Sequence, residues 1–378
     1  MAFLDYDGLK RYTEKFKSWV SGSFVPKTPT SWAEIQREVQ LGHGAVLFPV
    51  GSQLTLTHSV YGDIAMDVVS HDTVKKYGDE NAHTMTLMAH DCIASLQFDA
   101  PEAMYYAESG LAAGTYCFKV NNGPDSWADG TYNFTLATEV PAGGQIRIDG
   151  ATGTPLTSLY IKTYASQYSN DVLETTEKTI ASGEAGELLG TLNEDLNQGH
   201  RIYVGSNNYK ESAIRQFLNS DAEAGSVWTP QTHFDRAPSW AKSTAGFLNG
   251  CPEDFLDAIA TAVVKCSANN TYECPASMGG TVTKNTAYEL TDKIFLASET
   301  EVGLNGGDVT DGSALYEFFD GASDADRIKY LNGSAQHWWL RTPYIWRAFS
   351  PRYVKTSGSL DAYYAQSSFG LVPACIIA

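Results

Sequence analysis

The sequence predicts an α+β fold with an inserted small antiparallel β-sandwich module and an N-terminal helix. Three observations carry this prediction: helical periodicity near the N-terminus, closely spaced strands between Gly and Pro turns in the middle of the chain, and mixed helix and strand patterns towards its end. We therefore expect four parts: a helix with its linker (1–30), the first part of a main domain (31–96), a β module (97–182) and the second part of the main domain (183–378).

Residues 5–20 have the pattern of an amphipathic helix, and a linker with Gly and Pro follows them. Apolar side chains recur at steps of three and four residues, with Lys and Glu on the other face: Leu9, Tyr12, Phe16, Trp19 and Val20. A lone helix of this length is marginal in water, so it must dock on another surface. That surface is either its own domain, or copies of itself or a particle.

A second helix is expected from Ser31, because Ser31 and Glu34 form a capping-box pattern. Strand-like alternation follows over residues 45–71, in VLFPV, QLTLTHSV and DIAMDVVSH. In the segment 97–182, GTYCFKV and GTYNFTLATEV share a Gly-Thr-Tyr-X-Phe opening, and PAGGQIRIDG and TSLYIKTYA supply further strand-and-turn units. Short strands at this spacing, separated by Gly and Pro turns, predict the β-sandwich module.

After residue 183 the pattern becomes mixed. Tyr209–Leu218 and Pro252–Cys266 have helical periodicity, and the second carries proline in its first turn. Lys293–Ser298 is a candidate for a buried strand, and Ser313–Phe319 and Ala325–Leu331 are expected to be short helices. Helices packed on a small sheet make this part α+β.

The last stretch of the chain, residues 338–378, has apolar ends and an aromatic middle. It reads WWLRTPYIWRAFSPRYVKTSGSLDAYYAQSSFGLVPACIIA. The two ends have the short apolar runs of buried strands, whereas Pro and Gly divide the middle into loops and tight turns. Large aromatic side chains on loops offer wide contact area at low entropy cost, as in antibody paratopes. The middle of this stretch therefore predicts a recognition surface.

Three motifs in this stretch carry a family resemblance: WWLRTP, then VKTSGSL, then AQSSFGLVPACII. Together they resemble the variable region of diversity-generating retroelement variable proteins, in the phage and gut-bacterial branch with a C-type-lectin-like (formylglycine-generating-enzyme-like) C-terminal domain. The opening SWAEIQREVQLGHG and the later DIAMDVVSHD resemble the start of the same domain. The resemblance implies a C-type-lectin-like fold whose terminal strands pair.

The resemblance also implies a function. Such a protein is a non-enzymatic receptor-binding protein or tail-fibre-type adhesin, whose adenine-templated codons are rewritten while a frame stays fixed. Trp338, Trp339 and Arg341 belong to the frame, and Arg341 is expected to brace the loops. The residues expected to contact ligand, none of which is Asn, are Tyr344, Ile345, Trp346, Arg347, Phe349, Ser350, Arg352, Tyr353, Asp361, Ala362, Tyr363, Tyr364, Ser367 and Phe369.

The partners implied are a host cell-surface receptor, protein or glycan, two further copies of the chain in a homotrimer, and other virion proteins reached through the N-terminal helix. The expected location is the virion after synthesis in the bacterial cytoplasm, since residues 1–17 lack the apolar core of a signal peptide. The sequence offers no apolar run of about eighteen residues for membrane insertion. A net charge of −18 argues against a nucleic-acid groove.

Motifs for catalysis are absent from the sequence, which contains no GxSxG, Walker-type loop, HExxH or GxGxxG. The six cysteines include no CxxC and no zinc spacing, so buried free thiols are expected, with a Cys266–Cys274 disulfide as the alternative. His83 with His90, and Asp308 with Asp311, are better interpreted as polar surface residues than as metal ligands. We expect no cofactor.

Two other function classes stay open. One is a formylglycine-generating-type oxidase, which needs a pair of reactive cysteines, whereas Cys375 lies in an apolar run without a nearby partner. The other is a structural virion decoration protein, whose C-terminal residues would contact another particle component.

Overall fold

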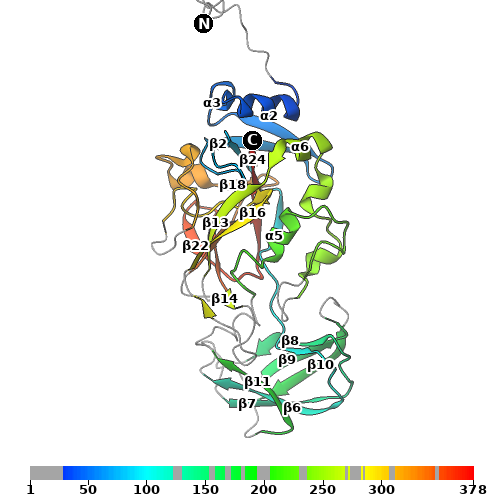
Figure 1. Ribbon diagram of the computed structural model, residues 1–378. Helices are drawn as coiled ribbons and strands as arrows, with labels where there is room; N and C mark the ends of the chain where they lie inside the picture. Colours follow the sequence, from blue (N-terminus) through cyan, green and yellow to red (C-terminus); the bar gives the residue numbers. More distant parts are fainter. Residues whose placement is uncertain are drawn as a thin grey trace, which may run out of the picture.

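The computed structural model describes residues 29–121, 130–152, 158–166, 172–179, 184–193, 205–229, 236–268, 271–272, 282–283, 286–305, 311–344 and 349–378. Strands predominate over helices in these residues, which confirms the prediction of an α+β fold (Figure 1). The amphipathic helix expected at residues 5–20 lies outside the described residues. None of the helices in the described part of the chain has the length and hydropathy of a transmembrane span.

Two short helices open the described chain. Helix α2 (Trp32–Gln40) begins after Ser31, whose hydroxyl accepts the Glu34 amide, and the Glu34 carboxylate accepts the Thr30 amide at 2.8 Å. Helix α3 (Gly44–Leu47) occupies part of the segment that we expected to be a strand. That expectation is wrong at VLFPV, because Pro49 has no amide to give to a sheet ladder.

The main sheet joins the two ends of the described chain. Its order is β1-β2-β3-β24-β12, with β17 also paired to β24. Ala374 lies opposite Met88 and Ile377 opposite Met85, so the last strand pairs with β3 from the first part of the main domain. The strands are β1 (Gln53–His58), β2 (Gly62–His71), β3 (Met85–Ala89), β12 (Ile259–Ala260), β17 (Ile294–Phe295) and β24 (Ala374–Ile377).

A second sheet holds most of the C-terminal stretch. Its order is β22-β21-β20-β23-β4, in which β20 and β23 run parallel and the other pairs are antiparallel. The strands are β4 (Ala94–Gln97), β20 (Trp338–Pro343), β21 (Pro351–Val354), β22 (Leu360–Ala362) and β23 (Ser368–Leu371).

Helices and hairpins cover these sheets. The helix expected over Pro252–Cys266 is half wrong: α6 (Glu253–Ala258) ends early, and β13 (Ala262–Ala268) pairs with β16 (Thr286–Asp292). The apolar alternation of residues 262–266, with two valines, suits a strand buried on one face. The remaining elements are α5 (Ala213–Leu218), η2 (Ser239–Lys242), η3 (Phe247–Gly250), η5 (Glu317–Phe319), η6 (Asp324–Arg327), β14 (Thr271–Tyr272), β15 (Val282–Thr283), β18 (Lys329–Leu331) and β19 (Ser334–Gln336).

The chain between β4 and α5 builds a separate pair of sheets. One has the order β10-β9-β8-β5 and the other β11-β6-β7. Strand β11 runs parallel to β6 and lies beyond residue 182, so the module is longer than expected and not wholly antiparallel. Its strands are β5 (Tyr105–Ala107), β6 (Gly114–Asn121), β7 (Gly130–Leu136), β8 (Gly144–Thr152), β9 (Ser158–Tyr164), β10 (Val172–Thr179) and β11 (Glu187–Asn193).

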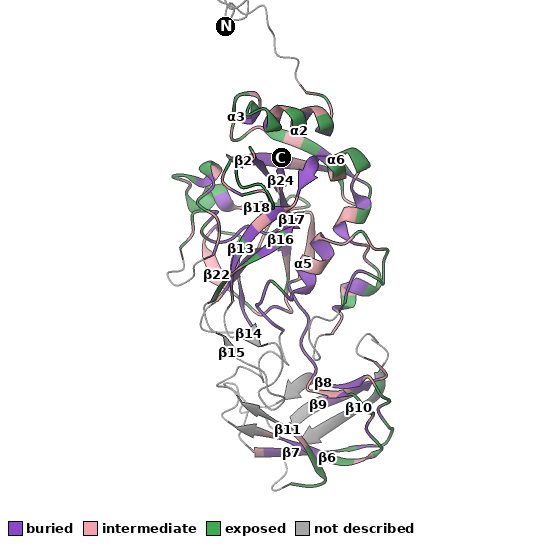
Figure 2. Cartoon of the chain, in the orientation of Figure 1, coloured by how far each residue is buried: buried purple, intermediate pink, exposed green. Residues whose placement is uncertain are grey.

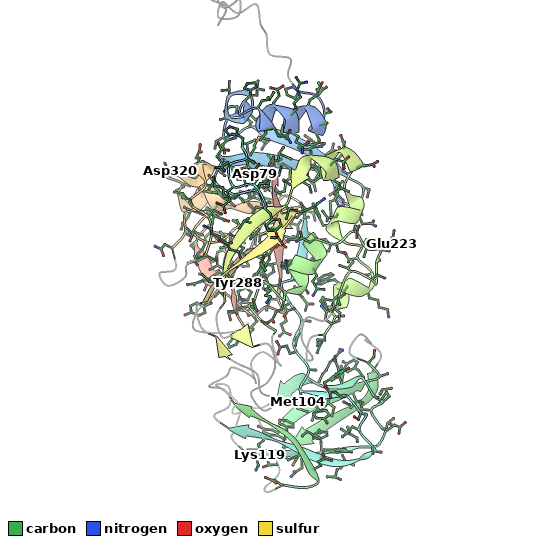
Figure 3. The ribbon with its side chains drawn as sticks, viewed as in Figure 1. Asp79, Met104, Lys119, Glu223, Tyr288 and Asp320 are labelled. Atoms are coloured by element: carbon green, nitrogen blue, oxygen red, sulfur yellow. The ribbon has the colours of Figure 1, made fainter. Side chains whose placement is uncertain are left out.

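The molecule is elongated, with the module at the end opposite to α2 and α3 (Figure 1). The two parts have separate hydrophobic cores, and buried residues line the strands of the main domain (Figure 2). Met104 and Lys119 lie in the module, whereas Tyr288 lies on β16 of the main domain (Figure 3). The second sheet, which carries the candidate surface, belongs to the main domain and packs on its hydrophobic core.

Candidate ligand-binding surface

The frame of the surface is strand β20, whose side chains are buried. Trp338 and Trp339 have no exposed area, and each indole finds a backbone acceptor. The Trp338 Nε1 donates to the carbonyl of Arg327, and the Trp339 Nε1 donates to the carbonyl of Leu96, both at 3.0 Å. Buried tryptophans normally need such acceptors, so these two bonds fix the ring orientations.

Arg341 lies deeper in the same strand and holds several elements at once. Its guanidinium forms a bidentate pair with Glu301 at 2.6 and 2.7 Å, and both side chains are 1% exposed. It also donates to the carbonyls of Leu296 and Lys265 at 2.5 and 3.1 Å. Burial by itself would raise the pKa of Glu301, but the Arg341 charge holds that pKa below its usual range.

Above the frame lies an aromatic cluster centred on Phe369. Its ring centroid lies 4.5 Å from that of Trp339, 4.7 Å from Tyr353 and 5.9 Å from Tyr363. The cluster continues from Tyr363 to Tyr364 at 5.0 Å. These separations are those of favourable ring pairs, so the aromatic residues support one another from the buried frame outwards.

The exposed end of the cluster is Tyr363, which keeps 47% of its surface accessible. Seven further residues from the set expected to contact ligand are partly exposed: Tyr344, Arg352, Asp361, Ala362, Tyr364, Ser367 and Phe369. Ile345, Trp346 and Arg347 lie outside the described residues.

Three of the expected contact residues are buried instead. Phe349 and Ser350 are each 2% exposed, and Tyr353 is 6% exposed. The Phe349 ring packs on Tyr364 at 5.7 Å, and Tyr353 packs on Phe369. Their side chains support the loops rather than face a ligand, so assigning them to the contact surface was wrong.

Arg352 is held from within the domain. Its Nε lies 3.4 Å from the buried Glu299 carboxylate, and its guanidinium carbon lies 4.6 Å from the centroid of the Tyr344 ring. A guanidinium within about 6 Å of an aromatic ring face is attracted by the ring quadrupole. Arg352 therefore orients Tyr344 as well as adding charge to the surface.

A second polar group lies beside the cluster. Lys355 and Asp361 form an ion pair at 2.7 Å, with 38% and 46% of their side chains exposed. Burial, together with the nearby Asp361 carboxylate, raises the pKa of Tyr353 to about 12. Burial and the Lys355 charge lower the pKa of His337, whose Nδ1 accepts the Thr356 amide at 3.1 Å. These groups give the surface both signs of charge at its rim.

Asn207 contacts the same surface from a distant part of the chain. Its Nδ2 donates to the carbonyls of Tyr344 and Ser350, each at 3.2 Å, while the Tyr344 amide donates to the Ser350 carbonyl at 2.9 Å. Asn207 was not predictable from the sequence, because nothing in the run Ser206–Tyr209 distinguishes it from an ordinary loop.

Metal ligands do not gather among the described residues, which hold no group of three or more His, Cys, Asp or Glu suited to an ion. His83 pairs with Asp72 at 3.2 Å, and His90 pairs with Asp67 at 2.9 Å. Asp311 is buried and accepts the Thr342 hydroxyl, whereas Asp308 lies outside the described residues.

The cysteines within the described ranges are buried free thiols, at positions 92, 117, 251, 266 and 375. The thiol of Cys266 donates to the carbonyl of Val264, and Cys274 lies outside the described residues. Burial raises the pKa of Cys375 well above that of an ordinary thiol. A buried thiol with a raised pKa is a poor nucleophile.

Comparison with known proteins adds a family. One family model, described as a domain of unknown function (DUF6273), matches residues 171–378, which include the whole candidate surface. No curated protein and no solved structure matches the chain. Since the matched residues make up more than half of the sequence, the chain belongs to the DUF6273 family.

Proposed function

We propose that this protein is a non-enzymatic binding protein that displays a retroelement-diversified, aromatic-rich surface on a rigid C-type-lectin-like scaffold. The observation that carries the proposal is the contrast in burial along the second sheet. Trp338, Trp339 and Arg341 are at most 1% exposed, whereas Tyr363 and its partly exposed neighbours end at the surface. A surface that is rewritten needs such a separation between support and contact.

Energetics supports this division. Truncating a buried Trp costs about 3–5 kcal/mol, because a cavity adds to the lost transfer free energy. Exposed loop side chains contribute little to stability, and substitutions there usually change it by less than about 0.5 kcal/mol. Residues such as Tyr363 can therefore be exchanged without unfolding the domain, whereas residues such as Trp339 cannot.

The sheet topology is consistent with the lectin-like part of the proposal. Strand β24 pairs with β3, so the last strand joins the first part of the main domain, as expected when terminal strands pair. In sequence, the variable stretch then runs from the end of β20 to β23 and includes β21 and β22 of the second sheet. The support for a lectin-like scaffold is therefore this pairing of strands from the two ends of the main domain.

The ligand that suits the surface is a receptor on a host cell, protein or glycan, bound by a phage fibre or tail protein. Aromatic residues and Arg dominate binding hot spots, and both occur here. Trimer formation would add avidity to weak single sites. Light scattering at micromolar concentration tests this part of the proposal: a homotrimer is expected, and a monodisperse monomer contradicts it.

The deciding experiment is to sequence the 3′ end of the gene and its downstream neighbourhood in a population of the source. We expect substitutions confined to adenine-templated codons between residues 344 and 369, beside a near-identical template repeat and a reverse transcriptase gene. An invariant 3′ end without a template would overturn the proposal and leave an adhesin of fixed specificity or a structural particle protein.

A further inference from the structure

The hairpin loop between β20 and β21 is closed at its two ends by backbone contacts. The Tyr344 amide donates to the Ser350 carbonyl at 2.9 Å, and the Asn207 side chain donates to the carbonyls of both residues at 3.2 Å. Asn207 has no exposed surface. One buried amide from outside the loop thus holds both of its ends.

The chemistry of this contact requires an amide. A side-chain NH₂ group carries two donors, which match two carbonyl acceptors. The opposite orientation would place the Asn207 oxygen against two carbonyl oxygens, so the hydrogen-bond partners fix which way the amide points. Both acceptors are main-chain atoms, so the contact does not depend on which side chains the loop carries.

Asn207 is itself held in place by the main domain. The Asp99 carboxylate accepts the amides of Ser206 and Ala213, both at 3.3 Å. The hydroxyl of Tyr288, on strand β16, donates to the Asn208 side chain at 3.0 Å. The position of the Asn207 amide is therefore set by residues outside the loop.

The same network reaches the second loop of the surface. The Asp99 amide donates to the Ala365 carbonyl at 3.1 Å, and the Ala365 amide donates to the Phe349 carbonyl at 3.0 Å. The Cβ of Ala365 also lies 3.2 Å from where a Cβ on Gly205 would stand, so the two segments are in close contact. Again every acceptor on the loops is a main-chain carbonyl.

We propose that Asn207 is a positioning residue of the candidate surface: it clamps Tyr344 and Ser350 through their main-chain carbonyls, whatever side chains residues 345–348 carry. The clamp matters for recognition only if the proposed function is correct, but its structural effect does not depend on any ligand. The segment that leads from the β module back to α5 thereby becomes part of the recognition apparatus.

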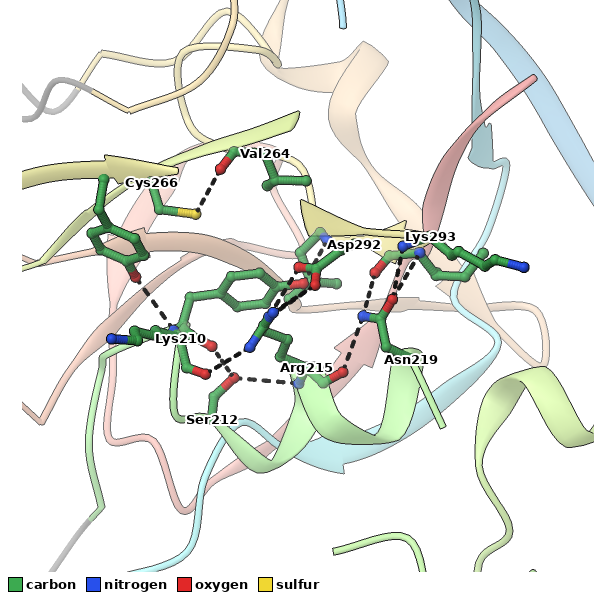
Figure 4. Close-up of polar contacts among 12 residues, drawn as sticks. Lys210, Ser212, Arg215, Asn219, Val264, Cys266, Asp292 and Lys293 are labelled. Carbon is green, nitrogen blue, oxygen red and sulfur yellow. Dashed lines mark hydrogen bonds and ion pairs between the residues drawn. The ribbon is translucent and has the colours of Figure 1, made fainter. Parts of the chain in front are cut away.

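Asn207→Asp tests the clamp, because Asp has nearly the same size but offers no donor and repels the two carbonyls. The matched control is Asn219→Asp. The Asn219 Nδ2 donates to the Ile294 carbonyl at 2.8 Å, and its Oδ1 accepts the Lys293 amide at 2.9 Å (Figure 4). The control thus removes two amide-to-carbonyl bonds, to Arg215 and Ile294, at a partly buried position away from the loop.

The assay is a surface-displayed library in which residues 345–348 are randomised in the parent, N207D and N219D backgrounds. The readout is the fraction of clones that survive a protease challenge, relative to the unrandomised clone in each background. We expect this fraction to fall about tenfold in N207D, the scale of one to two net hydrogen bonds, and to be unchanged in N219D. Equal fractions in N207D and N219D would overturn the proposal.

Amide hydrogen exchange gives a second measurement if N207D is poorly folded. In Asn207→Ala, protection of the Tyr344 and Ala365 amides should fall more than that of the β24 amides; uniform loss would contradict the clamp. Neither assay uses a ligand, so an invariant 3′ end would overturn the proposed function and leave the clamp standing. Conversely, the gene could be diversified while the surviving fractions of the N207D and N219D libraries are equal. That result would overturn the clamp and leave the proposed function standing.

Discussion

At the scale of single residues, buried charge is concentrated beneath the candidate surface. Glu299, Glu301 and Asp311 lie close to Arg341 and Arg352, and all but Arg352 are at most 4% exposed. Arg341 neutralises Glu301 by a bidentate pair. Removing one partner from a buried pair leaves an uncompensated charge, which is more costly than the absence of both.

Asp311 is the acid in this group without a guanidinium of its own. Burial raises its pKa from 3.8 to about 6, against the opposing effect of Arg341 and of the Thr342 hydroxyl bond. Between these two pH values, Asp311 stays protonated in the folded protein but is ionised in the unfolded chain. The contribution of Asp311 to stability is therefore lost as the pH rises from 3.8 to about 6.

Asp311→Asn should stabilise the protein at about pH 7.5 by about 1–2 kcal/mol and give no advantage at about pH 3.5. The Asn oxygen can still accept the Thr342 hydroxyl, whereas no charge has to be buried. Thermal denaturation of both proteins across this pH range measures the effect. A difference in melting temperature that does not change with pH would contradict it.

The residues of the frame were predictable, whereas their partners were not. Trp338, Trp339 and Arg341 stand next to one another in an apolar run, which favours a buried strand. Glu301 and Asn207 lie far away in the chain, and no local pattern connects them to this strand. The same limit explains the wrong assignment of Phe349, Ser350 and Tyr353, since a loop sequence does not show which aromatics pack on one another.

At the scale of elements, the β20–β21 hairpin joins the buried frame to the exposed surface. Trp339 lies opposite Tyr353, and β22 places Asp361 beside Tyr353 on the other side. The pairs form a row across the sheet that runs from full burial to partial exposure. Position in this row, rather than aromatic character, decides whether a side chain supports the fold or faces solvent.

Trp339→Ala and Tyr363→Ala should therefore differ sharply. The first should destabilise the protein by about 3–5 kcal/mol, because it empties the site beneath Phe369. The second should change stability by less than about 0.5 kcal/mol yet weaken binding of a selected ligand by fivefold or more, about 1 kcal/mol. Chemical denaturation and a binding titration measure the two effects. Tyr363→Ala with unchanged affinity would remove Tyr363 from the contact surface.

Element boundaries were least predictable where a helix gives way to a strand. Residues 252–266 keep an apolar face at both helical and strand spacing, and the structure changes from α6 to β12 at Ile259. The pairing of Ile259 with Ile377 and Ala260 with Ile376 decides the change, because it completes the main sheet. Such a tertiary contact overrides local propensity.

At the scale of the whole molecule, the main domain and the β module have separate hydrophobic cores. In the module, Phe118 is 1% exposed and stacks on Tyr132 with ring centroids 5.2 Å apart. The close strand spacing of this segment made a β module predictable from sequence. Its parallel β11 was not, because a parallel pairing between distant strands leaves no turn signal.

Calorimetry should show two unfolding transitions. Phe118→Ala should destabilise the module by about 3–5 kcal/mol and lower the temperature of one transition, with the other unchanged. A single transition that moves as a whole would mean that the two parts unfold together. Leu87→Ala is the reciprocal variant, since Leu87 is fully buried in the main domain.

Strand β24 comes after the recognition residues in the chain but lies inside the main sheet, between β3 and β12. Translation must therefore pass through the whole candidate surface, in frame, before the central strand is made. A stop codon or a shifted reading frame between residues 344 and 369 deprives the sheet of that strand, and the product cannot complete its core. If this gene is rewritten as proposed, folding itself acts as quality control on each new version: only messages that stay in frame and free of stop codons yield a protein that completes its main sheet.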